Sequence, residues 1–261
     1  QESAQVDQTA EPGLSVSGFV DASSYTDHNA RTSSFGLDQV EVDIEKSFSN
    51  QATVRADLEY LNDGQGGFEF GLEQGYVQWS VGGNWKWDLA FGKFNVPMGY
   101  ECADPTDMYQ YSCGLVSAYC IPGNVTGVLV TLAAPKVVSW SLYAVNGWDV
   151  NSDNNKDKTF GSRVALSPNE SFLLGLSTIT GPELDDNNSA RRTVLDCDIT
   201  YTLRPSWLIG AELNTGWESK TIADTGTASW SGMLLMTNLK FATRYGLTLR
   251  GDYLNDRDGN R

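Results

Sequence analysis

Carboxylates carry the most evident chemistry in this sequence. The longest connection between predicted strands, residues 97–124, contains Glu101, Asp104 and Asp107, and no Lys or Arg occurs between Phe94 and Pro135. We expect this segment to fold into the lumen of a β-barrel and to lay three carboxylates across its narrowest part. A low-dielectric wall around such charges focuses their field and concentrates counter-ions. The segment is therefore the candidate pore constriction, with a solvated acidic surface as the alternative.

Further charges alternate with apolar residues along the predicted strands. The whole chain of 261 residues has 33 Asp and Glu against 18 Lys and Arg, a formal net charge of -15. The excess of acid argues against nucleic acid as a partner, because phosphate binding requires a basic surface. The residues that we expect to form the pore wall are Asp43, Arg55, Asp57, Glu59, Asp88, Arg163, Asp196, Asp198, Glu212, Arg250 and Asp252.

Three cysteines crowd the same long connection. Cys102, Cys113 and Cys120 do not have the C-x-x-C spacing of zinc or haem sites. Exported proteins meet an oxidising compartment, so we expect one disulfide among these three, with the pairing left open. Cys197 lies on a predicted strand and is expected to be a free, small apolar residue.

Metal and catalytic chemistry find little support. Asp149, Asn151 and Asp153 alternate like calcium ligands, but Asn154 and Phe160 occupy the positions where an EF-hand has Gly and Glu. A hydrated polar loop is the favoured interpretation, with a weak calcium site as the alternative. The single histidine, His28, has no identifiable partner acid or nucleophile. We predict neither a cofactor nor an enzyme.

The elements that position these residues show a period of two from end to end. Val40, Val42 and Ile44 alternate with acids, as do Trp85, Trp87 and Leu89 with polar residues. No apolar run reaches the roughly 18 residues of a membrane helix. About thirteen strands are predicted, near 14–24, 36–48, 51–62, 67–80, 84–96, 125–134, 136–147, 158–167, 170–180, 191–204, 206–219, 228–243 and 246–255.

Strand and loop lengths indicate a membrane barrel. Most predicted strands run about ten to fourteen residues, whereas a tilted membrane-spanning strand needs about 9 to 11 and soluble strands average about 5 to 6. Long and short connections alternate, as outer loops and periplasmic turns do in up-and-down barrels. Trp85, Trp87, Tyr143, Tyr201, Trp207 and Tyr253 are expected to form interfacial girdles. The fold class predicted is an all-β, antiparallel, up-and-down transmembrane β-barrel.

The predicted organisation has two parts. Residues 1–13 form a periplasmic N-terminal extension and residues 14–261 form the outer-membrane barrel. The start at Gln1 indicates a mature exported protein whose signal peptide has been removed. Thirteen is an odd number, so we expect one or more closing strands to be missing and a complete barrel of about 14 to 16 strands. A soluble secreted β-protein is the alternative.

An ordered set of short motifs resembles the OmpL-like outer-membrane porins, the beta-barrel porin-2 family. It begins with Gly18-Phe19-Val20-Asp21-Ala22 and continues with Gly92-Lys93-Phe94 and Pro97-Met98-Gly99-Tyr100-Glu101. The later motifs are Asn146-Gly147-Trp148-Asp149, Gly161-Ser162-Arg163, Trp230-Ser231-Gly232, and Leu249 to Asp256 followed by Asp258-Gly259 and Arg261. Departures from the family are the absent closing strands and the three crowded cysteines.

The resemblance implies a passive channel for small hydrophilic solutes in a Gram-negative-type outer membrane, with its N-terminus in the periplasm. Together with the acidic residues, it leads us to expect a weak preference for cations. The expected surroundings are outer-membrane lipid, with solutes or cations inside and a homo-oligomer such as a trimer, or an envelope protein, as partner. The alternative is a structural barrel, occluded or serving as a sleeve or anchor for a partner or surface layer.

Overall fold

The computed structural model describes residues 13–29, 31–49, 51–63, 67–83, 85–101, 104–134, 137–222 and 226–261. These residues form thirteen antiparallel β-strands that follow one another up and down, which confirms the predicted all-β class. The strands are β1 (Leu14–Asp27), β2 (Thr32–Ser47), β3 (Ala52–Asn62), β4 (Phe68–Val81), β5 (Lys86–Asn95), β6 (Asn124–Ala134), β7 (Val138–Val145), β8 (Thr159–Asn169), β9 (Phe172–Gly181), β10 (Arg192–Arg204), β11 (Trp207–Ile222), β12 (Gly226–Ala242) and β13 (Tyr245–Asp256).

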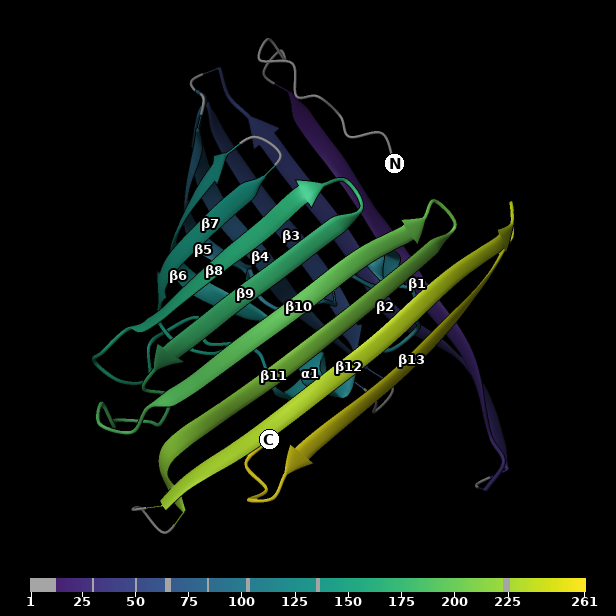
Figure 1. The fold of residues 1–261 in the computed structure, drawn as a ribbon. Coiled ribbons are helices and arrows are strands. Elements are labelled where there is room, and N and C mark those ends of the chain that lie inside the picture. Colours follow the sequence, from purple (N-terminus) through teal and green to yellow (C-terminus); the bar gives the residue numbers. More distant parts are fainter. Residues whose placement is uncertain are drawn as a thin grey trace. The chain divides into compact units, whose positions relative to one another are not determined.

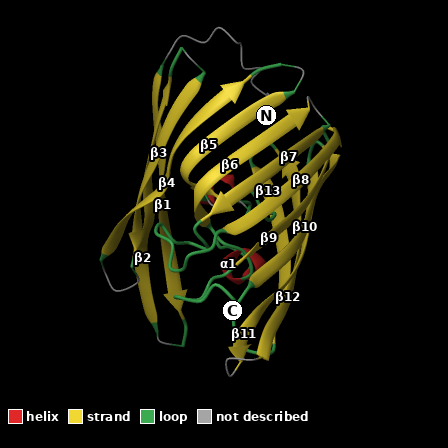
Figure 2. Cartoon of the chain, turned by 90° about the vertical axis from the view of Figure 1, so that its left-hand side faces the viewer, coloured by secondary structure: helices red, strands yellow, loops and turns green. Residues whose placement is uncertain are grey.

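Two short helices interrupt this pattern, both in the connection between β5 and β6 (Figure 2). They are the 3-10 helix η1 (Pro105–Asp107) and the α-helix α1 (Leu115–Tyr119). Among the described residues, no helix has the length and apolarity to cross a membrane.

The chain divides into two compact units, residues 1–81 and 82–261. In the first unit, β1 to β4 pair in chain order, each antiparallel to the next. In the second unit, β5 to β13 do the same, coloured from teal to yellow in Figure 1. The hydrogen-bonded neighbour of each strand is therefore its neighbour in sequence, as the loop lengths predicted.

The two faces of the strands differ in burial, with a period of two. On β12, Ala228, Trp230, Gly232, Leu234 and Met236 are buried, whereas the residues that alternate with them are exposed. We call the face with the buried side chains the inner face and the opposite one the outer face. The outer face carries large exposed apolar side chains on nearly every strand, among them Val42, Leu89, Phe91, Leu213 and Leu235. Such a surface is unfavourable in water and suits contact with hydrocarbon.

One aromatic residue departs from the predicted girdle. Trp85, Trp87, Tyr201, Trp207 and Tyr253 are exposed as expected, but Tyr143 is buried on the inner face. The expectation for Tyr143 was wrong because Gly161, its register partner on β8, leaves room for the ring. A Cβ on Gly161 would lie 2.0 Å from Cζ of Tyr143.

Candidate functional site

The candidate site is the inner face of the second unit together with the segment that packs on it. This 97–124 segment is built around α1, whose N-cap, Gly114, has no side chain to accept from the free backbone N–H groups. Glu101 instead satisfies the backbone N–H of Gly114 itself, since its Oε2 accepts from that nitrogen at 2.6 Å. A carboxylate at a helix N-terminus is favourable because the exposed N–H groups carry partial positive charge.

An apolar contact holds α1 against β12 and β13. Val116 and Cys120 are both fully buried, at 0% exposure. They lie over Gly232 of β12, where a Cβ would come within 2.8 Å of Cγ2 of Val116 and 3.5 Å of Sγ of Cys120. Glycine at this position therefore lets the segment approach the sheet closely.

Arg250 of β13 ties the segment to the sheet by charge. Its Nη1 lies 2.9 Å from Oε1 of Glu101, and its Nε donates to Oδ2 of Asp252 at 3.1 Å. The same guanidinium also donates to the backbone oxygens of Ser112 and Cys113. Three residues predicted from sequence, Glu101, Arg250 and Asp252, thus meet in one network.

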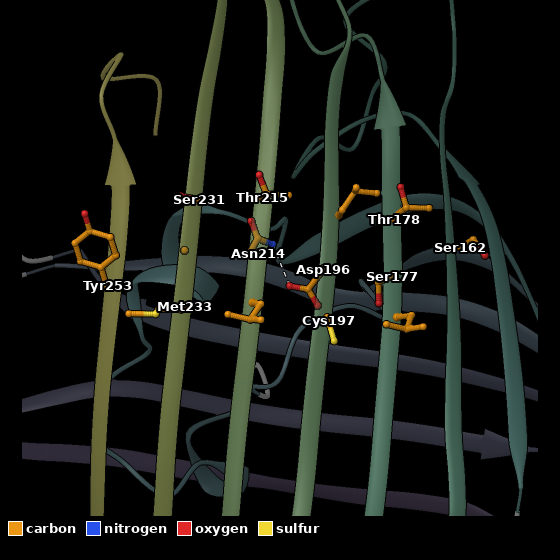
Figure 3. A pocket seen from close by; sticks show the side chains of 14 residues that line it. Ser162, Ser177, Thr178, Asp196, Cys197, Asn214, Thr215, Ser231, Met233 and Tyr253 are labelled. Carbon is orange, nitrogen blue, oxygen red and sulfur yellow. Dashed lines mark hydrogen bonds between the residues drawn. The ribbon is translucent and has the colours of Figure 1, made fainter.

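A second polar contact joins the start of the segment to β11. The backbone N of Tyr100 donates to Oε2 of Glu212 at 3.3 Å. Tyr100 packs over Gly210, where a Cβ would lie 2.0 Å from its ring. Beside Glu212, Nδ2 of Asn214 donates to Oδ2 of Asp196 on β10 at 3.0 Å, the contact drawn in Figure 3.

Asp198 and Arg163 form a separate pair on the same face. Nη2 of Arg163 lies 2.9 Å from Oδ1 of Asp198, and Nη1 also donates to Oγ of Ser177. The planar guanidinium contacts both carboxylate oxygens, which is a strong geometry. Gly175 of β9 leaves the space that this pair occupies.

The first unit has its own inner-face network. Nε of Arg55 lies 2.8 Å from Oδ1 of Asp57, and Nη2 lies 3.8 Å from Oδ1 of Asp43. Gln74 donates to Oδ2 of Asp57 at 2.6 Å. Glu59 is half-buried on the same strand as Asp57. In the second unit, Asp88 is half-buried and pairs with Lys86 at 3.7 Å.

The other two predicted constriction residues, Asp104 and Asp107, differ in burial. Asp104 is half-buried at the start of η1, and Asp107 is exposed. Asp107 lines a hollow of about 180 Å³ together with Tyr100, Glu101 and Thr200. Glu101, one of the three predicted constriction carboxylates, forms an ion pair with Arg250 of the sheet.

The weak calcium candidate is not assembled. Oδ1 of Asp149 accepts from the backbone N of Gly123 and Asn124, at 2.8 and 3.0 Å. Asp153 instead accepts from the backbone N of Asn155 and pairs with Lys158. Asp149 therefore ties its loop to the start of β6, and Asp153 orders its own loop.

The cysteines of the 97–124 segment do not form the expected disulfide within the described residues. Cys113 and Cys120 are both free, as is Cys197, and Cys102 lies outside the described residues. Cys113 and Cys120 flank the five-residue helix α1. Burial raises the pKa of the Cys120 thiol to about 12.

Sequence analysis missed one buried charged cluster, which is centred on Glu218. Glu218 is buried and accepts from Arg192, Asn260 and Arg261 at 3.0 to 3.2 Å. The Arg261 guanidinium lies 4.4 Å from the ring centroid of Trp230. Arg192 and Glu218 are register partners on β10 and β11. Both lie within the predicted strands 191–204 and 206–219, so the pairing of that hairpin was the signal that could have found them.

A groove on the outer face lies over the same strands. Its volume is about 740 Å³, and Leu176, Leu195, Leu213 and Met233 of its lining are exposed apolar residues (Figure 3). We assign it to the hydrocarbon-facing surface rather than to the polar site.

Comparison with known proteins identifies a family over nearly the whole chain. The family model described as "Putative beta-barrel porin-2, OmpL-like" matches residues 13–261. Among curated proteins, none matches the chain in sequence.

Solved structures of outer-membrane proteins share the fold. The outer membrane channel DcaP of Acinetobacter baumannii superposes with a TM-score of 0.64 at 12% identity, covering 96% of this chain and 81% of that one. An anion-selective porin from Comamonas acidovorans gives 0.60 at 15% identity, covering 95% and 80%. The trimer form of Vibrio cholerae OmpT gives 0.52 at 10% identity, covering 95% and 90%. These neighbours establish the outer-membrane β-barrel fold.

Proposed function

We propose, on the premise that the chain belongs to the OmpL-like beta-barrel porin-2 family, that it is a passive diffusion channel for small hydrophilic solutes with a weak preference for cations. Membership places the protein in the bacterial outer membrane as a channel. The preference for cations and the path of the solute are the parts that we add.

The observation that carries the proposal is the packing of the 97–124 segment on the inner face. Glu101 is fastened to Arg250, and α1 is buried against β12. A carboxylate-bearing segment held on the inner face narrows the space available to a solute there. Asp107, which is exposed, would then face the solute path.

The charge pattern of the inner face supports a preference for cations. Arg55, Arg163, Arg192 and Arg250 each pair with a carboxylate, so their positive charge is locally neutralised. Exposed Asp107 adds negative charge in the segment that packs on the inner face of the second unit. Negative charge along a narrow path raises the local concentration of cations.

Single-channel conductance in a planar bilayer tests the transport proposal. We expect stepwise, ohmic current increments in 1 M KCl after insertion of the purified protein. Asp107→Asn should insert equally well and lower the preference for cations. Failure of inserted, folded protein to pass current would refute the channel.

An occluded structural barrel is the second candidate function. The apolar packing of α1 against the sheet favours it. Val116, Cys120 and Leu234 are buried as in a protein core, which suits a plug as well as a constriction. In that case deletion of the residues of α1 would allow a current that the intact protein does not pass.

We further propose that the N-terminus is periplasmic, that several copies associate, as in the trimer form of OmpT, and that no catalytic centre is present.

A further inference from the structure

A small hollow lies between the 97–124 segment and the inner face of β10 and β11. Its volume is about 180 Å³. Sites for drug-sized ligands occupy about 300 to 1,000 Å³, so this hollow suits a smaller molecule. The polar and aromatic side chains that line it are Tyr100, Glu101, Asp107, Tyr109, Gln110 and Thr200, all from the second unit.

Gln110 brings to the hollow a hydrogen-bond donor that the described residues leave unused. Its Nε2 is buried and has no acceptor within the described parts of the chain. A buried amide N–H without an acceptor is unfavourable, so it is normally satisfied by water or by a ligand. Thr200 of β10 adds a hydroxyl, which both donates and accepts.

The charge of the lining disfavours an anionic ligand. No Lys, Arg or His is among the described residues that line the hollow. Of the two carboxylates, that of Glu101 is already used, because Oε1 pairs with Arg250 and Oε2 accepts from the backbone N of Gly114. Asp107 is exposed and supplies an acceptor. The hollow therefore offers both a donor and an acceptor, with no positive charge.

Two tyrosines give the hollow an aromatic part. The backbone N of Tyr100 donates to Glu212 at 3.3 Å, and its ring packs over Gly210. Tyr109 is 43% exposed. A tyrosine ring combines a large apolar surface with a polar hydroxyl. A ligand with C–H faces and hydroxyl groups around its edge matches such a lining.

We propose that this hollow is a subsite for one neutral monosaccharide on the solute path. The hydroxyls of a sugar ring donate to Asp107 and accept from Gln110, and its C–H faces suit contact with tyrosine. An amine donates only and would leave the N–H of Gln110 without an acceptor. A carboxylate accepts only and would be repelled by Asp107. The inference rests on the proposed channel function, for which it names a class of solute.

Saturation-transfer difference NMR with D-glucose tests the subsite at equilibrium. The intact protein is held in lauryldimethylamine oxide, a detergent without a sugar headgroup. We expect transfer to the ring protons of glucose that saturates as glucose is raised to 100 mM. Sodium acetate and methylammonium chloride, each at 100 mM, should not displace the sugar. Thr200→Val and Gln110→Leu should each weaken the apparent affinity about fivefold or more, the loss of one hydrogen bond.

The matched control is Thr202→Val. It removes a hydroxyl two positions further along the same face of β10, outside the described lining of the hollow. This variant should bind glucose as the wild type does, and equal thermal unfolding midpoints would show that the variants are folded.

Absence of saturable transfer in the wild type overturns the proposal, whatever the variants do. So does displacement of glucose by methylammonium or acetate, or unchanged affinity in both Thr200→Val and Gln110→Leu. Binding is measured without a membrane, so the two proposals fail separately. A protein that conducts but does not bind glucose refutes the subsite alone, whereas one that binds glucose but passes no current refutes the channel alone.

Discussion

Arg250 on β13 and Glu101 in the 97–124 segment form an ion pair at 2.9 Å although 149 positions separate them in sequence. Both side chains are largely buried, at 14% and 5% exposure. Removing one partner of such a pair leaves a buried charge, at a cost of about 3 to 5 kcal/mol. Arg250→Leu should therefore lower the free energy of unfolding by an amount approaching this range, as measured by urea unfolding in detergent micelles.

The paired variant Arg250→Leu with Glu101→Leu serves as the control for that prediction. Because neither charge remains, the double variant should be more stable than the sum of the two single losses implies. Strict additivity would show that the ion pair does not couple the segment to the sheet.

Substitution by alanine should destabilise the protein at Gly210 and leave its stability unchanged at Gly251. A Cβ at Gly210 would lie 2.0 Å from the ring of Tyr100, whereas nothing lies within 4 Å of a Cβ at Gly251. Gly210→Ala should destabilise the protein by about 1 to 3 kcal/mol, because the aromatic ring has to move. Gly251→Ala should be neutral within about 0.5 kcal/mol. Heat-modified mobility in SDS gels gives a direct comparison, and equal midpoints would argue against the contact of Tyr100 with the sheet.

Cys113 and Cys120 should differ in reactivity towards a maleimide. Cys113 is exposed, whereas Cys120 is buried and its pKa is raised to about 12 by burial. The thiolate is the reactive form, so Cys120 should remain unlabelled at pH 8 until the protein is denatured. Labelling is read by peptide mass spectrometry in the Cys102→Ser background. Rapid labelling of Cys120 in the folded protein would show that α1 does not rest on β12.

The carboxyl of Glu183 should make the protein less stable as the pH rises above the ordinary pKa of a glutamate side chain. Burial raises the pKa of this loop carboxyl, despite hydrogen bonds from Thr159 and the backbone of Trp148. The folded state therefore binds the proton more tightly than the unfolded state. The stability gained at low pH is lost as the pH rises from the unfolded pKa, about 4.3, through the raised folded value.

Glu183→Gln is the comparison for this pH dependence. The variant cannot ionise, so the difference in unfolding free energy between variant and wild type should grow across that pH window. A constant difference between pH 4 and pH 8 would contradict a raised pKa. The slope belongs to the difference between the two proteins, since other carboxyls titrate in both.

The strand pattern was predictable because alternation is a local property of the chain. Val42 and Leu89 are exposed on the outer face, and Asp57 and Glu212 are buried on the inner face, as a period of two requires. The residues at which strands begin and end were less predictable. β2 begins at Thr32 rather than near residue 36, since Thr32 to Ser34 pair with the end of β1.

The contacts of the 97–124 segment could not be read from sequence. The acidity of the segment predicted Glu101 as a constriction residue. The partner of Glu101, Arg250, depends instead on how α1 docks on β12 and β13. The same docking buries Glu212, which alternation alone placed on an open pore wall. Tyr143 points inward because of a glycine on the next strand, a relationship between strands that a single-strand pattern does not contain.

The central claim, an outer-membrane channel with a cation-preferring path, is tested most directly by the reversal potential in a planar bilayer. With 1.0 M KCl on one side and 0.1 M on the other, the purified protein should give a zero-current potential of the sign set by excess potassium permeability. Asp107→Asn should move that potential towards zero. A potential of the opposite sign, showing excess chloride permeability, would contradict the account.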